Sequence, residues 1–322
     1  MLKAVARSVM PAAAWSRIQQ FKQYIQSPAR LRDAMEYFGY TVAPESNYYS
    51  PLPSTRGLRR TFDRWNRPSA MRGIAYDLEA MKRELTSLLA DYLEEFLALP
   101  PYAELQQHGF GPGYTAVDAL TLYVMIRRLK PNRYLEVGSG LSTYYCTLAA
   151  AKNAEEGHPV ALTCIEPYPY PRLHSIPGIT IIAKEVQDLP VSTFQELQPG
   201  DVFFIDSSHI VRIDGDVPYL FLEILPARAA GVVVHIHDIP FPYNIPYPPE
   251  EWVFGQPRWP AFWNEAMLVQ ALLSANRSFR ITMSTPLLRH FDEPFLQQAI
   301  PFYETLRQNP NAFSSLWLHK VE

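Results

Sequence analysis

The stretch from Arg133 to Thr143 constrains the fold of this chain more than any other. Its first residues are mostly apolar and predict a short buried strand that ends at Glu136, and a helix is predicted from Ser142. Between them, Gly138 and Gly140 allow the backbone to bend sharply and leave N–H groups exposed at the helix N-terminus. We therefore expect a ligand to approach this turn closely.

The carboxylate of Glu136, two residues before the first glycine, indicates the kind of ligand. A dinucleotide fingerprint has the form G-x-G-x-x-G, in which the third glycine allows helix and strand to pack closely. In this chain Thr143 occupies that third position. A negative charge at Glu136 suits a ligand that has a cationic amino acid portion and no pyrophosphate. The alternative is an ordinary glycine turn of an α/β protein.

Apolar strands alternate with helices along the rest of the chain. Stretches of nearly continuous Val, Ile, Leu and Phe predict a parallel sheet that is covered on both faces. Further strands are predicted at 160–166, 179–183, 202–206, 232–237, 279–283 and 316–321, the last two as an antiparallel edge pair. Helices are predicted within 1–40, from Met71 to just before Pro100, and at 116–129, 142–151, 217–225, 261–275 and 293–307.

Together, the Glu-x-Gly-x-Gly pattern and this alternation resemble the class I S-adenosylmethionine-dependent methyltransferases. The resemblance covers residues 116–322 and implies a Rossmann-like, seven-stranded, mostly parallel sheet in the order 3-2-1-4-5-7-6, with helices on both faces. Residues 1–115 are then an N-terminal helical cap and loop region, and residues 116–322 are the methyltransferase domain. In this family the helix before the first strand closes over the cofactor, so Tyr114 and Asp118 are expected to line its pocket.

Acidic residues stand at the ends of successive predicted strands. These ends are Glu136, Glu166, Asp206 and the pair His237-Asp238. The carboxyl ends of parallel strands face the crevice in which α/β sheets bind ligands. Because buried carboxylates are unfavourable without partners, packing alone does not explain such a series. We expect a ligand, a metal ion or both at this edge of the sheet.

The cofactor implied by the resemblance is S-adenosylmethionine. Glu166 is placed to accept hydrogen bonds from both ribose hydroxyls, a role that would serve S-adenosylmethionine and NAD equally. In the family a side chain near Gln187-Asp188 lies against the adenine amino group, although a solvated turn is an alternative there. The predicted cofactor-binding residues are Glu136, Gly138, Ser139, Gly140, Ser142, Thr143, Glu166 and Asp188.

The segment from Asp206 to His209 resembles the I-D-x-x-H segment of a subgroup of small-molecule methyltransferases. In metal-dependent members, catechol-type O-methyltransferases among them, an acid after strand four and an acidic or amide pair after strand five hold a divalent ion. The matching positions are Asp206, His237 and Asp238. His237 stands where oxygen ligands are usual, and a mixed set would suit Mn, Fe or Zn better than Mg.

Two other interpretations of these histidines stay open. Without a metal, His209 or His237 would be the general base that takes a proton from a hydroxyl nucleophile. Alternatively, both histidines would be structural. The predicted catalytic residues are His209, His237 and Asp206. Since His235 alternates with His237 along the strand, we assign His235 to packing.

Composition limits the compartments and partners that we expect. A net charge of −3 and a pI near 6.3 argue against a broad electrostatic grip on nucleic acid. Cys146 and Cys164 are interpreted as small buried hydrophobes in a reducing compartment, so we expect a cytoplasmic protein. No apolar run approaches the roughly 18 residues that a membrane span needs, so no membrane partner is expected. A homodimer is left open.

Aromatic residues surround the exit of the fifth predicted strand and give either an acceptor pocket or a partner-binding surface. They are Tyr243, Tyr247, Trp252, Trp259 and Trp263. The sequence favours methyl transfer to a hydroxyl of a small-molecule acceptor. Two alternatives are an NAD-dependent oxidoreductase on a similar sheet and a non-catalytic protein of this fold that binds partners.

Overall fold

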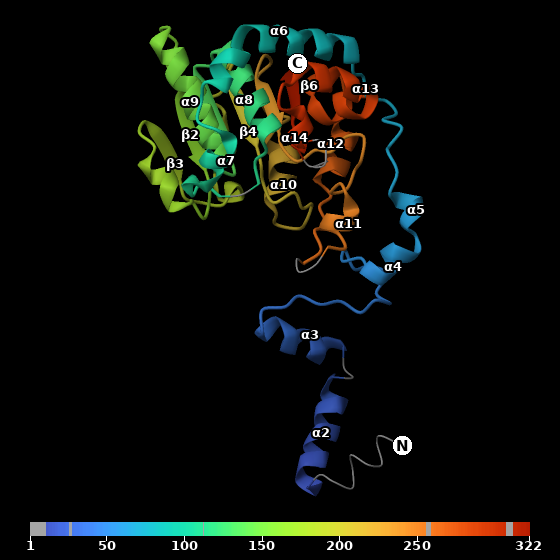
Figure 1. Cartoon of the computed structure of the whole chain (residues 1–322). Helices are drawn as coiled ribbons and strands as arrows, with labels where there is room; N and C mark the ends of the chain where they lie inside the picture. Colours follow the sequence, from blue (N-terminus) through green and yellow to red (C-terminus); the bar gives the residue numbers. More distant parts are fainter. Residues whose placement is uncertain (1–10, 26–27, 112, 256–258, 307–311) are drawn as a thin grey trace. The chain divides into compact units, whose positions relative to one another are not determined.

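The structure is a computed structural model, and it describes residues 11–25, 28–111, 113–255, 259–306 and 312–322 (Figure 1). The chain divides into two compact units, Met1–Phe62 and Asp63–Glu322. The first unit contains α2 (Ala12–Ile25), α3 (Pro28–Tyr37) and α4 (Thr55–Arg60), which confirms helices within residues 11–40. The first residues of the chain, 1–10, lie outside the described part.

The second unit is built around a seven-stranded sheet in the order β3-β2-β1-β4-β5-β7-β6, which confirms the predicted topology. Strands β1 to β5 are parallel, whereas β7 runs antiparallel to both β5 and β6. The strands are β1 (Arg133–Val137), β2 (Ala161–Ile165), β3 (Ile179–Ile182), β4 (Val202–Ile205), β5 (Val233–Ile236), β6 (Phe279–Ser284) and β7 (Leu316–Lys320).

Helices cover both faces of the sheet, as Figure 1 shows. The central strands β4 and β5 are buried along their whole length, because both of their faces lie under helices. The longer helices of this unit are α6 (Leu78–Leu97), α8 (Ala116–Leu129), α9 (Leu141–Glu155), α12 (Glu265–Leu273) and α13 (Thr285–Ala299). Shorter ones are α5 (Phe62–Trp65), α7 (Tyr102–Leu105), α10 (Asp216–Pro218), α11 (Pro249–Trp252), α14 (Tyr303–Leu306) and a π-helical turn at Tyr219–Ile224.

Helix α8 is joined to its neighbours through the buried side chain of Arg127. Its Nε donates to Glu95 Oε1 of α6 at 2.6 Å, and its other nitrogens donate to Asn153 of α9 and to Glu156, the residue that follows this helix. Such a buried charge is stable only because several acceptors surround it. Helix α6 therefore packs with the sheet in the second unit, and the predicted domain boundary between residues 115 and 116 stays a prediction.

The predicted start of α6 at Met71 was wrong. Met71 has a φ of 49°, and Gly73 follows in a turn, so the helix cannot begin there. Instead, Asp77 caps the helix by accepting a hydrogen bond from the Ala80 N–H at 2.9 Å. The apolar spacing continues across this turn, which explains why periodicity alone extended the helix too far.

The predicted helix start at Glu293 coincides with a break inside α13, but the sequence analysis missed the helical segment before the break. The helix begins directly after β6, where Ser284 caps it by accepting from the Leu287 N–H and Pro286 occupies the first turn. Asp292 has a non-helical φ of −151°, so the helix is kinked just before Pro294. Helix α12 is shorter than predicted, because the N–H groups of Asn264 and Glu265 donate to the His209 carbonyl.

Among the described residues, no helix combines the length and apolar character needed to cross a membrane. Cys146 lies on α9 and Cys164 on β2, and both are free and buried as predicted.

Candidate active site

The glycine turn after β1 has no room for a side chain. Gly138 has a φ of +78°, and a Cβ there would lie 1.7 Å from the Asp206 carbonyl oxygen. The Gly138 N–H donates to the Ile165 carbonyl at 3.0 Å, and the Asp206 N–H donates to the Val137 carbonyl at 2.8 Å. The ends of β1, β2 and β4 are thus held together at one point, which only glycine can occupy.

Glu136 lies beneath this turn and does not line the cavity above it. Its carboxyl group accepts hydrogen bonds from Ser142 Oγ and, at 2.6 Å, from Thr143 Oγ1. Thr143 Oγ1 also accepts from the Gly140 N–H at 3.0 Å. Complete burial raises the pKa of Glu136 to about 8. The three side chains therefore fasten the turn to the start of α9.

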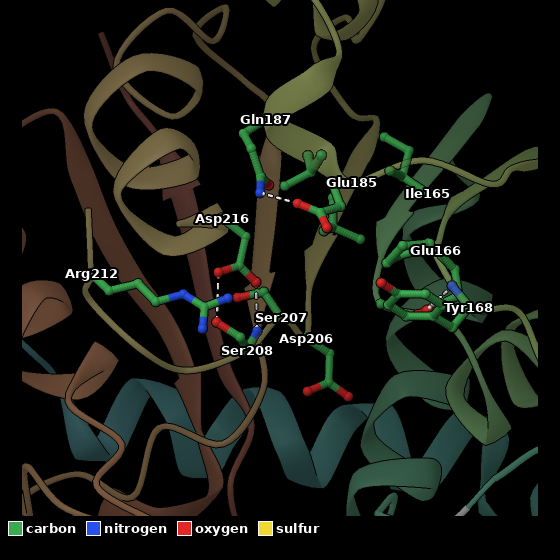
Figure 2. A pocket seen from close by; sticks show the side chains of 14 residues that line it. Ile165, Glu166, Tyr168, Glu185, Gln187, Asp206, Ser207, Ser208, Arg212 and Asp216 are labelled. Carbon is green, nitrogen blue, oxygen red and sulfur yellow. Dashed lines mark hydrogen bonds between the residues drawn. The ribbon is translucent and has the colours of Figure 1, made fainter. Parts of the chain in front are cut away.

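A cavity of about 270 Å³ opens at the ends of β1, β2 and β4 (Figure 2). Glu166 lines it, and the two carboxylate oxygens accept from the Tyr168 N–H at 2.8 Å and the Ser139 N–H at 3.2 Å. Gln187 also lines the cavity and donates to Glu185 at 2.6 Å. Asp188, in contrast, is exposed and is not part of the lining.

Asp216 holds the loop that follows β4, a contact that the sequence analysis did not anticipate. Its carboxylate accepts from the Ser208 N–H at 2.7 Å and from Ser208 Oγ at 2.6 Å (Figure 2). Asp216 begins α10, so its side chain joins that helix to the loop. Arg212 and Asp216 both belong to the wall of the cavity.

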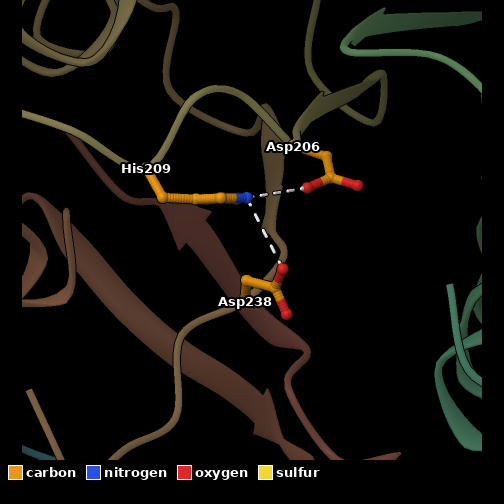
Figure 3. A group of neighbouring side chains, drawn as sticks. All are labelled: Asp206, His209 and Asp238. Atoms are coloured by element: carbon orange, nitrogen blue, oxygen red, sulfur yellow. Dashed lines mark ion pairs between the residues drawn. The ribbon is translucent and has the colours of Figure 1, made fainter. Parts of the chain in front are cut away.

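Beside the cavity, the side chains of Asp206, His209 and Asp238 form a group whose nitrogen and oxygen atoms lie within 4.8 Å of one another (Figure 3). His209 Nε2 is 3.4 Å from Asp206 Oδ1 and 3.5 Å from Asp238 Oδ2. His209 and Asp238 have φ values of 61° and 56°, a region that residues other than glycine rarely adopt. Such strain is found at sites whose side chains are held for a function.

The second histidine, His237, contacts the same two aspartates from another direction. Its Nδ1 is 3.4 Å from Asp206 Oδ1 and 3.8 Å from Asp238 Oδ1. Tyr114 lies over the imidazole, with ring centroids 4.7 Å apart. The sequence analysis predicted His237 as a metal ligand and as a catalytic residue, and His209 as a catalytic residue. The structure brings both histidines to the aspartates, and it groups His209 with them most closely.

Each histidine has a buried carboxylate on its outer ring nitrogen. His209 Nδ1 is 2.7 Å from Glu265 Oε2, and His237 Nε2 is 3.2 Å from Asp118 Oδ2. Glu265 was missed by the sequence analysis, because it lies on α12, 56 residues beyond His209 with no local motif around it. The outer carboxylates leave the other ring nitrogen of each histidine directed at Asp206 and Asp238.

The charges of this cluster change the pKa values of its members in opposite directions. Burial disfavours the charged histidines, but hydrogen bonds to Asp206 and Glu265 outweigh it and raise the pKa of His209 well above its ordinary value. Burial is likewise outweighed for His237, whose pKa is raised by Asp238 and Asp206. Although burial alone would raise it, the two histidines lower the pKa of Asp206. Burial raises the pKa of Asp238.

His235 has the packing role that strand alternation predicted. Its ring stacks on Trp317 with centroids 3.9 Å apart and an interplanar angle of 8°. It is completely buried, and burial lowers its pKa well below the ordinary value. A neutral, stacked imidazole of this kind belongs to the core.

The five aromatic residues after β5 fall into separate groups. Trp263 lies 4.5 Å from the His209 ring and 4.8 Å from Trp252, between centroids. Tyr243 stacks on Tyr247 at 4.0 Å, and both line a second cavity of about 310 Å³. Trp259 is largely exposed.

Comparison with protein families places these features in one domain. A family model described as a methyltransferase domain matches residues 135–239. The match runs from β1 to just beyond the end of β5 and includes the glycine turn and the two histidines. The sheet order is the one that the resemblance to class I methyltransferases predicted. The glycine turn, Asp206, His209 and His237 thus lie within a region that is similar to methyltransferase domains.

Individual proteins resemble this chain over different lengths. A protein of Archaeoglobus fulgidus is 28% identical over 173 residues, which are 49% of this chain and 74% of that protein. The O-methyltransferase of Bacillus cereus, solved with SAH, has 13% identity and a TM-score of 0.39, covering 76% of this chain and 100% of its own. TomG of Streptomyces achromogenes, an O-methyltransferase of tomaymycin synthesis solved with SAM, has 14% identity and a TM-score of 0.39, covering 77% and 91%.

Proposed function

We propose that this methyltransferase transfers the methyl group of S-adenosylmethionine to a hydroxyl group of a small-molecule acceptor, with the help of a divalent metal ion. The observation that carries this proposal is the convergence of two histidines on Asp206 and Asp238, beside the cavity at the glycine turn. Each histidine is held from outside by a buried carboxylate.

The residues around the cavity fit the cofactor. A Cβ at Gly138 would fill the space against the Asp206 carbonyl, so glycine keeps the cradle open. Glu166 already accepts two backbone N–H groups, and its remaining lone pairs are available to ribose hydroxyls. Of the predicted residues, Gly138, Ser139, Gly140 and Glu166 are proposed to contact the cofactor. Glu136, Ser142 and Thr143 would shape the turn beneath it.

S-adenosylmethionine supplies a methyl group that is already electrophilic, so the protein mainly has to align the acceptor with it and remove a proton. In the transfer, the new O–CH₃ bond forms as the S–CH₃ bond breaks. The cavity would hold the cofactor, and Asp206 belongs both to the lining of this cavity and to the group that it forms with His209 and Asp238.

The donor set of Asp206, His209 and Asp238 fits a divalent transition metal. Histidines that bind metals usually donate their other ring N–H to a carboxylate, as the Glu265 contact allows. A mixed set of imidazole and carboxylate suits Mn, Fe or Zn better than Mg. A metal ion there would orient the acceptor hydroxyl and lower its pKa.

We assign acceptance of the hydroxyl proton to Nδ1 of His237. This nitrogen is buried and has no hydrogen-bond partner among the described residues, and it faces Asp206. The negative charges of Asp206 and Asp238 raise the pKa of His237. A cation held by these aspartates would offset their charges and favour the neutral imidazole, whose Nδ1 could then take the proton.

Calorimetric titration of S-adenosylmethionine into chelator-treated protein is the first test. It is repeated with Mg, Mn, Fe(II) or Zn on the wild type, on Asp206→Ala and on Glu250→Gln, a control at an exposed carboxylate of α11 outside the cavity. We expect the cofactor to bind without metal, and a metal to bind the wild type and the control but not Asp206→Ala.

Transfer of a labelled methyl group to a panel of hydroxylated acceptors then tests the reaction. Absence of cofactor binding under every condition would contradict the proposed function. Activity that is unchanged by chelation would remove the metal from the proposal and leave His209 or His237 as the base.

A further inference from the structure

Asp118 is a carboxylate with no exposed surface, placed in the first turn of α8. It lies outside the region that matches the methyltransferase family model, 119 residues before His237. A buried carboxylate is unfavourable unless several donors surround it, so its contacts show what it holds in place.

Donors from three parts of the chain converge on Asp118. Its Oδ1 accepts from the Ser314 N–H at 3.2 Å and from Ser315 Oγ at 2.8 Å. Its Oδ2 is 2.7 Å from Thr115 Oγ1, 3.1 Å from Ser314 Oγ and 3.2 Å from His237 Nε2. The backbone N–H of Ser314 is a fixed donor, which settles that Oδ1 must be an acceptor.

The two ring nitrogens of His237 differ in their contacts: Nε2 has hydrogen-bond geometry to Asp118, whereas Nδ1 forms no hydrogen bond among the described residues, which favours a proton on Nε2 when the imidazole is neutral. Nε2 lies between two oxygens, Asp118 Oδ2 at 3.2 Å and Ser314 Oγ at 3.0 Å. If Nε2 carried a lone pair, it would face the lone pairs of the carboxylate. With a proton on Nε2 that proton is accepted, and the Ser314 hydroxyl donates its own hydrogen to Asp118.

We propose that Asp118 is a positioning residue that fixes the Nε2–H tautomer of His237 and thereby presents the Nδ1 lone pair to Asp206 and Asp238. Nδ1 is buried without a hydrogen-bond partner among the described residues, and it lies 3.4 Å from Asp206 Oδ1. The Tyr114 ring over the imidazole limits its rotation. The tautomer itself is independent of the proposed function, and only the catalytic use of Nδ1 rests on it.

Asp118→Asn separates this role from a purely structural one. The amide oxygen of asparagine must face the fixed Ser314 N–H, so its NH₂ group points at His237 Nε2 and at the two hydroxyls. The two hydroxyls, Thr115 Oγ1 and Ser314 Oγ, can accept hydrogen bonds from this NH₂ group. His237 Nε2 can accept one as well if the imidazole proton moves to Nδ1. The variant is therefore expected to fold with the opposite tautomer and with Nδ1 no longer able to accept a proton.

The experiment is long-range ¹⁵N–¹H correlation spectroscopy of His237 in the full-length protein, in the alkaline range where its ¹⁵N shifts no longer change. We expect the Nε2–H tautomer in the wild type and the Nδ1–H tautomer in Asp118→Asn. Asp77→Asn, the same substitution at the N-cap of α6, is the matched control and should leave the tautomer unchanged.

Two results would overturn the inference, whether or not Asp118→Asn folds. One is a wild-type His237 that carries its proton on Nδ1, and the other is an imidazole that stays doubly protonated throughout the alkaline range in which the protein is folded. A folded Asp118→Asn that keeps the wild-type tautomer would also overturn it.

Kinetics give a second readout. We expect kcat for methyl transfer to fall by about 10–100-fold in Asp118→Asn, with little change in KM for S-adenosylmethionine. An unchanged kcat in a variant with the switched tautomer would overturn the role of Nδ1. Because the tautomer is measured without turnover, a wild type that shows it but transfers no methyl group would contradict the proposed function alone.

Discussion

The two ends of the site are built in different ways. The end that we propose for the cofactor, here called the cofactor end, is a backbone cradle formed largely by one short segment, in which Gly138 is packed against the Asp206 carbonyl. The end that we propose for the reaction, here called the reacting end, consists of side chains from α8, the loop after β4, the end of β5 and α12. A cradle made of backbone tolerates only glycine, whereas a cluster of side chains depends on the partners that hold each of them.

Their buried carboxyl groups differ in the same way. Glu136 at the cofactor end has hydroxyl donors but no cation beside it, so burial raises its pKa to about 8. Asp206 at the reacting end is next to two histidines that lower its pKa despite burial. A buried carboxyl is thus neutral or charged according to the partners that the fold brings to it.

Gly138→Ala should have the largest effect and should destroy the cofactor end. The new Cβ would lie 1.7 Å from a carbonyl oxygen at a φ of +78°, so we expect a loss of stability of about 3 kcal/mol or more and no binding of S-adenosylmethionine. Chemical denaturation and calorimetry measure both. Gly157→Ala is the control, because its φ is +85° with no atom within 4 Å, and only the backbone strain applies.

Glu265→Gln should damage the reacting end alone. His209 would lose the carboxylate that holds its Nδ1 at 2.7 Å, and metal affinity should fall by about 10–100-fold while cofactor affinity is unchanged. Metal titration in a competition assay measures the first and calorimetry the second. Equal losses of both affinities would show that the two ends are not separable. The exposed Glu250→Gln on α11 serves as the control.

Glu166→Gln gives the reciprocal result at the cofactor end. Replacing a charged acceptor by a neutral amide should weaken the binding of S-adenosylmethionine by about 1.5 kcal/mol, which is close to a tenfold loss of affinity. Metal affinity should stay as in the wild type. Unchanged cofactor affinity would contradict the ribose contact that we propose for Glu166.

Glu136→Gln should have the smallest effect, seen in how stability depends on pH. Since the folded pKa of about 8 lies above the ordinary value of 4.5, the folded protein keeps a proton that the unfolded chain releases. The stability that this group contributes is therefore present below about pH 4.5 and is lost as the pH rises to about 8. We expect the variant to show a flatter curve of Tm against pH across this range, and an unchanged curve would contradict the raised pKa.

The sequence by itself determined the sheet, because its signals are local. Apolar strands with acidic ends, glycines in the turn and regular alternation with helices predicted seven strands, and the resemblance to class I methyltransferases supplied the order that the structure has. They also indicated Asp206, His209, His237 and Asp238 as one group, since carboxyl ends of parallel strands meet at one edge. Helix starts were less predictable, because the caps at Asp77 and Ser284 interrupt or precede the apolar spacing.

Only the tertiary structure decided how the histidines are held. Asp118 and Glu265 come from helices far along the chain in either direction, and nothing in their local sequence marks them as partners of His237 and His209. The same holds for Glu136, whose role beneath the turn follows from the hydroxyls that α9 places around it. Strand ends are encoded by short-range patterns, whereas the charge state and orientation of a buried side chain depend on whatever groups folding brings against it.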